Sequence, residues 1–119
     1  MTNHEIANKL VELCRKGDFE TALKELFSED AVSIEAYASP AFEKETKGLP
    51  AIIEKGGKFN SMVEEMHGIT LSEPVVAGNS FALSMRLDAV MKERGPMDIT
   101  ELCVYKVKDG KIISEEFFM

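Results

Sequence analysis

The chain has 119 residues, enough for a single domain over residues 1–119 that buries a core without disulfide or metal staples. Twenty-one acidic residues outnumber fourteen basic ones, so the formal net charge of −7 argues against nucleic acid or an anionic membrane surface as a partner. The apolar runs are shorter than the roughly 20 residues of a membrane helix, and the N-terminus lacks a secretory-signal pattern. We therefore expect a cytoplasmic protein.

The chain contains two cysteines, Cys14 and Cys103. Both lie in apolar-patterned segments, and neither has a second cysteine or a histidine at metal-ligand spacing. We expect buried free thiols, with no disulfide, no metal site and no cofactor.

The first part of the chain predicts two short helices. Asn3 is expected to cap the first helix, and Gly17 to end it in a left-handed conformation. The helical pattern restarts at Asp18. The apolar residues at helical spacing are Ile6, Leu10, Leu13 and Cys14 in the first helix, and Phe19, Ala22, Leu23, Leu26 and Phe27 in the second.

A strand and a third helix are expected next. Residues 31–37 alternate between apolar and other side chains, which predicts a strand, and a loop then leads to Pro50 in the first helical turn. This helix is expected to continue to Met66. Gly56 and Gly57 lie in its middle, where we expect a bend or the close approach of another backbone.

Beyond Gly68 the sequence predicts only strands. Turn signals at Gly78, around Gly95 and at the Asp109-Gly110 pair divide this part into an antiparallel meander. Helices, a strand, a helix and then a meander together predict an α+β fold.

The last hairpin allows its strand register to be counted. A type I′ turn at Asp109 and Gly110 pairs Lys108 with Lys111. Counting outward places a set of residues on one face of the hairpin, because side chains alternate along a strand. These residues are Glu101, Cys103, Tyr105, Ser114, Glu116 and Phe118, with Cys103 opposite Glu116, Glu101 opposite Phe118 and Tyr105 opposite Ser114.

Both faces of this hairpin are too apolar to be fully exposed. One face is expected to pack under the helices, and the other to meet a second subunit in a homodimer formed through the sheet. If the face with Glu101 is the covered one, burial and mutual repulsion raise the pKa of its carboxyl groups. Such carboxyl groups suit acid/base chemistry.

The order of elements and two local stretches resemble the SnoaL-like branch of the nuclear transport factor 2 superfamily, which includes ketosteroid isomerases. The two stretches read LFSEDAVSIE and VKDGKIISEEFF. The resemblance covers nearly the whole chain and implies a curved antiparallel sheet wrapped around about three N-terminal helices. It also implies a pocket between sheet and helices, often in a dimer. The resemblance indicates the fold more specifically than it indicates any one reaction.

The resemblance to the isomerases implies that one catalytic position retains a carboxylic acid in this chain and that two others carry different residue types. The general-base Asp of the isomerases falls on Glu35, a conservative change. Their protonated Asp falls on Cys103 and their oxyanion Tyr on Leu10, so both strong hydrogen-bond donors are absent. Glu101 lies two residues from Cys103 on the same face and could serve as the acid. Ketosteroid isomerisation itself is not expected.

The candidate site combines these positions with their neighbours. The predicted catalytic residues are Glu35, Glu101 and Glu116, and the predicted ligand-binding residues are Tyr37, His67, Met85, Cys103, Tyr105 and Phe118. Each has a simpler interpretation. Glu35 could be an exposed edge residue, Glu101 a solvated rim residue, and His67 a cation at a helix C-terminus. A register slip of one residue would exchange the faces of Glu115 and Glu116.

Two main functions remain open from the sequence. In the first, a pocket binds a small hydrophobic or carbonyl-containing ligand and isomerises, cyclises or dehydrates it, with Glu35 as base and Glu101 or Glu116 as proton donor. In the second, the chain is a non-catalytic dimeric domain for ligand binding or association. A pure dimerisation scaffold is a third, weaker interpretation.

Overall fold

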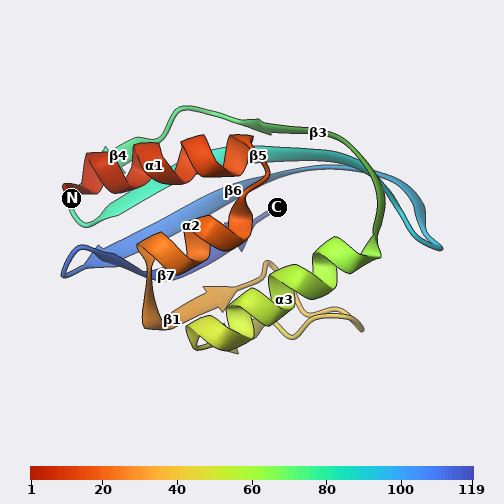
Figure 1. Cartoon of the computed structure of the whole chain (residues 1–119), viewed down its shortest axis with the longest axis horizontal. Coiled ribbons are helices and arrows are strands. Elements are labelled where there is room, and N and C mark those ends of the chain that lie inside the picture. The colour runs from red at the N-terminus through yellow and green to blue at the C-terminus, as the bar shows by residue number, and fades with distance from the viewer.

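Three helices and seven strands make up the computed structural model, which describes all residues 1–119 (Figure 1). The helices are α1 (Asn3–Arg15), α2 (Phe19–Leu26) and α3 (Leu49–Met62). The strands are β1 (Phe27–Ile34), β2 (Glu45–Lys47), β3 (Val63–Leu71), β4 (Val75–Ala77), β5 (Ser80–Met91), β6 (Gly95–Lys108) and β7 (Lys111–Phe118). The predicted α+β fold is confirmed. No helix is long and apolar enough to cross a membrane.

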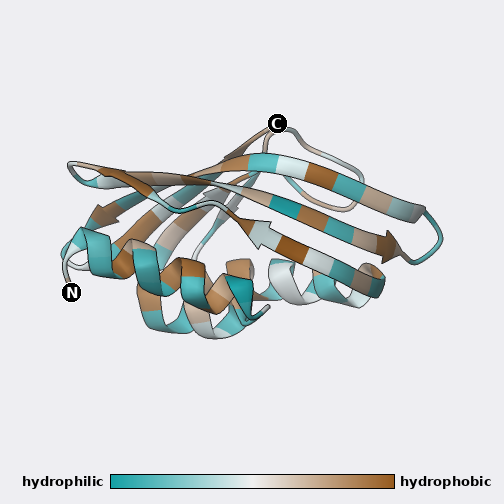
Figure 2. Cartoon of the chain, turned by 90° about the horizontal axis from the view of Figure 1, so that it is seen from above, coloured by the Kyte–Doolittle hydropathy of each residue, from teal (hydrophilic) through white to brown (hydrophobic).

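The strands form one curved sheet in the order β2-β1-β7-β6-β5-β3, with β4 paired to β5. The sheet is mixed, because β1 runs parallel to β7 while the other pairs are antiparallel. The helices lie on one side of the sheet and leave the other side without a helical cover (Figure 2). We call the helix-covered side the inner face and the opposite side the outer face.

The N-cap of the first helix lies one residue before the expected Asn3, which instead is the first helical residue. Thr2 is the N-cap, since its side chain accepts from the Glu5 backbone N–H while the Glu5 carboxylate accepts from the Thr2 N–H. Gly17 ends the helix with a φ of 75°, as predicted. Phe27, expected at the end of the second helix, instead starts β1.

Two element boundaries differ from the predictions because the tertiary structure, and not the local sequence pattern, decides where these elements end. The first strand spans Phe27–Ile34 and ends before Tyr37, because the chain turns away after Ile34 into a loop. The third helix ends at Met62, four residues before the expected Met66. Pairing of β3 with β5 takes the following residues into the sheet, overriding their helical spacing.

The expected close approach at the two glycines of α3 is wrong. A Cβ added at Gly56 or at Gly57 would meet no atom within 4 Å, and both residues are helical and exposed. Neither glycine is therefore required by a neighbouring backbone.

The core lies between the inner face and α1 with α2. Alternate residues of β5, from Phe81 to Met91, face inward and are buried. Tyr105 of β6 stacks on Phe81 with ring centroids 4.8 Å apart and meets Phe27 edge-on at 6.4 Å. This packing fixes the position of β6, the strand that carries Glu101 and Cys103.

Candidate functional site

The final hairpin keeps its predicted turn but not its predicted register. Asp109 and Gly110 have φ of 52° and 77°, and Lys108 pairs with Lys111. A β-bulge follows, because Val107 pairs with Ile112 while Lys106 pairs with Ser114. The extra residue shifts β7 by one position relative to β6. Tyr105 therefore faces Glu115, Cys103 faces Phe117, and Val104 faces Glu116.

This shift exchanges the predicted site residues of β7. Glu115 lies on the inner face and is 8% exposed, whereas Glu116 lies on the outer face beside Val104. Phe118 also lies on the outer face, opposite Leu102, and is 47% exposed. The predicted placement of Glu116 and Phe118 in the pocket is wrong, because the bulge reverses every side chain that follows it. Phe117 takes the inner position instead.

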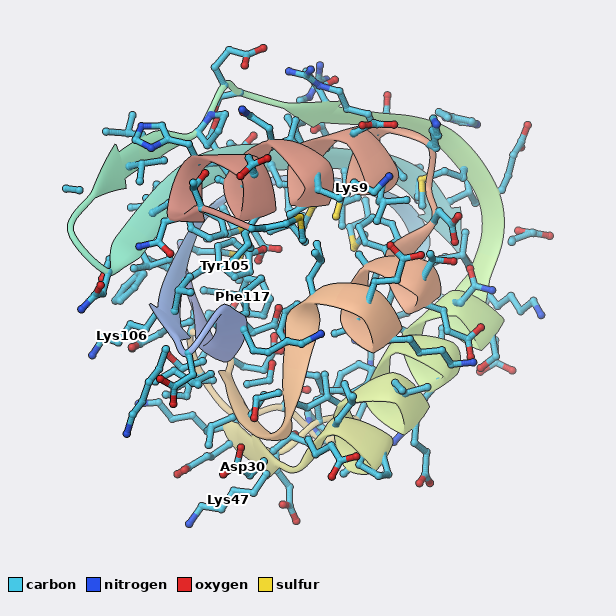
Figure 3. The ribbon with its side chains drawn as sticks, turned by 60° about the vertical axis from the view of Figure 1, so that its left-hand side comes forward. Lys9, Asp30, Lys47, Tyr105, Lys106 and Phe117 are labelled. Atoms are coloured by element: carbon cyan, nitrogen blue, oxygen red, sulfur yellow. The ribbon has the colours of Figure 1, made fainter.

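Inner-face positions of β6 and β7 come together below the helices. In Figure 3 Tyr105 and Phe117 lie inside the ring formed by the helices and the sheet, while Lys106, next to Tyr105, points away from it. Met85, Cys103 and Tyr105 lie on this inner face as predicted, and all three are buried. All three belong to the hydrophobic core.

A chain of charged and polar groups joins α3, β1 and β7. Lys55 of α3 donates to Ser33 Oγ at 2.6 Å and to Glu35 Oε2 at 2.8 Å. Ser33 in turn donates to Glu115 Oε2 at 2.7 Å, and the Ser33 side chain is fully buried. The parallel pairing of β1 with β7 sets Ser33 opposite Glu115, which is why these groups meet. We call Glu35, Lys55, Ser33 and Glu115 the lysine network.

Glu101 extends this arrangement on the neighbouring strand. It lies on the inner face opposite Met85 and is half-buried. Burial, followed by the negative charges of Glu35 and Glu115, raises the pKa of Glu101 from 4.5 to about 7, although Lys55 opposes the shift. At neutral pH this carboxyl group is thus present both with and without its proton.

Burial also changes the other titratable groups of the inner face. It raises the pKa of Glu115, against the hydrogen bond from Ser33 and the charge of Lys55. It raises the pKa of the Cys103 thiol and of the Tyr105 hydroxyl, so both stay protonated at neutral pH. Cys103 is accordingly a poor nucleophile.

Comparison with known proteins identifies the family. The family model for the SnoaL-like domain matches residues 1–119. A crystal structure from Mesorhizobium loti, of a candidate SnoaL-like polyketide cyclase, is 32% identical, has a TM-score of 0.93 and covers 100% of both chains. The chain belongs to the SnoaL-like family. A search of curated proteins found no match.

More distant structures share the fold of this SnoaL-like chain. A candidate isomerase from Bacillus subtilis is 21% identical, with a TM-score of 0.73 over 99% of this chain and 88% of its own. TerC, co-crystallised with polyporic acid, is 15% identical, with a TM-score of 0.75 over 97% of this chain and 88% of its own. The predicted SnoaL-like fold is confirmed.

Two other predicted ligand-binding residues lie away from the inner face of the SnoaL-like chain. Tyr37 is 64% exposed, because β1 ends before it and the loop carries it into solvent. His67 lies in β3 rather than after a helix, and its ring is within 3.4 Å of Glu65 and 3.6 Å of Asp88. Strand pairing with β5 moves it out of the site.

Three members of the network were missing from the sequence-based candidates. Lys55 follows the buried Ile52 by three residues, so helical spacing could have placed it on the inward side of α3. Ser33 shares the alternate side of β1 with Glu35, which was a candidate. Glu115 is exchanged with Glu116 by the bulge, for which the sequence carries no signal.

Solvent reaches the site at several points. The side chains of Glu35 and Lys55 keep 30% and 15% of their surface exposed. Lys55 also lines a groove of about 690 Å³ between α3 and the loop that contains Phe42. No group of three or more His, Cys, Asp or Glu side chains is arranged to hold a metal ion. The arrangement offers carboxyl groups for proton transfer and one cation.

Proposed function

We propose that this SnoaL-like protein binds a small neutral carbonyl compound and moves protons on it, as in an isomerisation, cyclisation or dehydration. Glu35 is the base and Glu101 the proton donor. The observation that carries the proposal is the half-buried Glu101, whose pKa of about 7 is raised partly by the charge of Glu35. Two carboxyl groups with different surroundings can divide the roles of base and acid.

The surroundings favour a hydrophobic ligand with one polar end. Phe117, Met85 and Ile99 supply apolar surface beside Glu101 on the inner face. The carboxyl groups disfavour an anionic ligand, since the single nearby cation, Lys55, is already paired with Glu35. TerC, with the same fold, was co-crystallised with an organic compound, polyporic acid, which supports the idea of a ligand site in this fold.

Hydrogen–deuterium exchange tests the proposal without knowledge of the natural substrate. A panel of small cyclic ketones is incubated with the protein in D2O, and proton NMR follows exchange at the carbon next to the carbonyl. We expect catalysed exchange that falls as the pH rises through about 7, because Glu101 then loses its proton. Glu35→Gln should abolish exchange, and Glu101→Gln should remove this decline with pH.

Glu116→Gln provides the matched control. It removes a carboxylate adjacent in sequence to Glu115 but on the outer face, so exchange should match that of the wild type. Ketones that bind without any exchange would contradict the proposal in favour of a non-catalytic ligand-binding domain. A carbon-13 NMR titration that places Glu101 near 4.5 would contradict the role of Glu101 as donor.

We also infer that two copies of the chain associate through the outer face. Leu102 and Phe118 are cross-strand partners there, 46% and 47% exposed, and Met119 follows at 62%. Exposed apolar side chains gathered on adjacent strands are typical of a protein contact, and an identical patch on a second copy is complementary by symmetry. The occupant we propose is therefore a second copy.

Sedimentation equilibrium of the wild type and of Leu102→Glu tests this association. The wild type should sediment as a dimer and the variant as a monomer, since the substitution places one carboxylate from each copy in the apolar interface. Lys106→Glu, on the same strand and face but nearer the turn, is the control for added charge. A monomeric wild type at all concentrations would overturn the inference.

A further inference from the structure

The ammonium group of Lys55 has one donor that the protein does not use. A lysine carries three N–H groups. Two of them bond to Ser33 Oγ and Glu35 Oε2, and no other hydrogen-bond acceptor contacts this nitrogen. The nitrogen also lies 5.8 Å from the centre of the Phe117 ring. The third N–H is thus available to an oxygen atom of a ligand packed against Phe117.

The other possible donors near Glu101 cannot serve a ligand well. Cys103 is fully buried and Tyr105 is 5% exposed, and these two side chains interact with each other. Lys55 is the one cation that acts on Glu101, against the negative charges of Glu35 and Glu115.

We propose that Lys55 binds the oxygen of an enolisable ketone and stabilises the negative charge that forms on it. This inference rests on the proposed function. Glu35 takes a proton from the carbon next to the carbonyl; the C–H bond breaks, its electron pair forms a C=C bond, and the carbonyl oxygen becomes negative. Glu35 becomes neutral as the oxygen becomes charged, so Lys55 faces one negative charge before and after the step.

The network explains why the Lys55 side chain is in place before the ligand binds. Its side chain is 15% exposed and is fixed by the fully buried Ser33, which is itself bonded to Glu115. A cation held in a partly dry site needs little reorganisation when charge develops on the ligand. Ser33 and Glu115 are therefore positioning residues that act through Lys55.

Phenols test the proposal, because an ionised phenol carries its charge on an oxygen like that of an enolate. We would titrate 4-nitrophenol in the presence of saturating Glu35→Gln protein, whose neutral amide stands for the protonated Glu35 of the enolate state, and follow the absorbance of the ionised phenol. Lys55 next to the phenol oxygen should then lower the pKa of the bound phenol below that of the free compound. The remaining carboxylates alone would raise it, so a raised pKa in Glu35→Gln overturns the proposal. The further substitutions are made in the same Glu35→Gln background.

Variants locate the effect at Lys55. Lys55→Met should weaken binding of 4-nitrophenolate roughly 10- to 100-fold and raise the pKa of the bound phenol. Lys58→Met is the matched control one helical turn away; Lys58 donates to the Ala41 carbonyl and lies 5.1 Å from the Phe42 ring, so phenol binding should be unchanged. Lys55→Arg keeps the cation and should keep part of the effect.

The outcomes separate this inference from the proposed function. Phenol binding that is equal with and without Lys55→Met, in folded protein, overturns the role of Lys55 and leaves Glu35 and Glu101 untouched. Absence of 4-nitrophenol binding also overturns the role of Lys55, whereas the proposed function fails only if the wild type catalyses no exchange of ketone protons. If Lys55→Met does not fold, Lys55→Arg and the Glu35→Gln titration still decide, since both keep a cation at this position.

Discussion

The helices α1 and α3 cover the same face of the sheet but are built differently. The 13 residues of α1 include six buried ones, an N-terminal capping box, and Arg15 in the last turn. The 14 residues of α3 include one buried residue, Ile52, with no side-chain cap and no charged residue suited to either end. Their locations differ too, since α1 contacts β3, β4 and β5, whereas α3 lies beside β1 (Figure 1) and carries Lys55 of the lysine network.

This difference indicates different roles for the two helices: α1 contributes mainly to stability and α3 mainly to the candidate site. Burial of apolar area is the main favourable term in folding, and α1 supplies far more of it than α3. Instead, α3 places Lys55 at the polar end of the inner face, near the carboxyl groups of Glu35, Glu101 and Glu115. Changes on α1 should affect mainly stability, and changes around α3 mainly the charge state of the site.

The largest expected effect is at the centre of α1. Ile6 is fully buried, so Ile6→Ala should lower the free energy of unfolding by about 2–5 kcal/mol through lost burial and a cavity. Ile53→Ala on α3, where the side chain is only partly buried, should cost about 1 kcal/mol. Urea unfolding followed by circular dichroism measures both. Equal losses would contradict the comparison of the two helices.

Removal of the Ser33 hydroxyl should have the next largest effect. Ser33→Ala leaves Lys55 and Glu115 each without a buried partner and should cost about 1–3 kcal/mol of unfolding free energy. The cost should be larger at high pH than at low pH, because the lost hydrogen bond stabilises the ionised form of Glu115. Ser114→Ala, on the outer face of β7, is the control and should change stability by less than about 0.5 kcal/mol. A pH-independent cost for Ser33→Ala would exclude coupling to Glu115.

Part of this molecule could be predicted from its sequence, and the rest has a physical reason for being missed. The helices of the first part and the Asp109-Gly110 turn follow from local signals, namely apolar spacing and positive φ. The bulge at Ile113 has no such signal, because Ile112 and Ile113 are equally suited to either face. That one extra residue decides which of Glu115 and Glu116 enters the site.

The lysine network shows a different limit of sequence-based prediction. Glu35 could be proposed from the resemblance to the isomerases, and Glu101 from its position on the hairpin face that also carries Cys103 and Tyr105. Helical spacing from Ile52 could place Lys55 on the inward side of α3, but a lysine on a helix is ordinarily solvated, and only the tertiary position of α3 brings it to Ser33. Contacts between elements far apart in sequence depend on packing, which local patterns do not report.

The third prediction concerns the loss of unfolding free energy that results from burying Glu101 in the site. Its pKa is higher in the folded protein than the ordinary value of 4.5, so the folded state holds more protons between about pH 4.5 and 7. Stability from this group is therefore full below pH 4.5, falls as the pH rises, and is lowest above 7. Glu101→Gln should raise the unfolding free energy by about 1–2 kcal/mol at pH 8 and leave it unchanged at pH 4.

Denaturant unfolding over a range of pH measures this effect. Glu116→Gln, which changes a carboxylate on the outer face, is the control and should change the unfolding free energy by less than about 0.5 kcal/mol. If Glu101→Gln stabilises the protein equally at pH 4 and pH 8, the gain does not come from the proton of Glu101. A gain in stability with a loss of exchange activity would mark Glu101 as kept for function.

The smallest expected effect is a gain at α3, the less buried of the two helices. Gly57→Ala meets no neighbouring atom and reduces the conformational freedom of the unfolded chain, so it should add about 0.5–1 kcal/mol to the unfolding free energy. The melting temperature, measured by calorimetry, should rise by about 2–4 °C. Gly17→Ala is the contrasting control, because its φ of 75° at the end of α1 strains any other residue and should lower stability. If Gly57→Ala instead lowers stability, the helix requires a glycine at this position. The small number of buried residues in α3 would then be a condition for motion of this helix at the site.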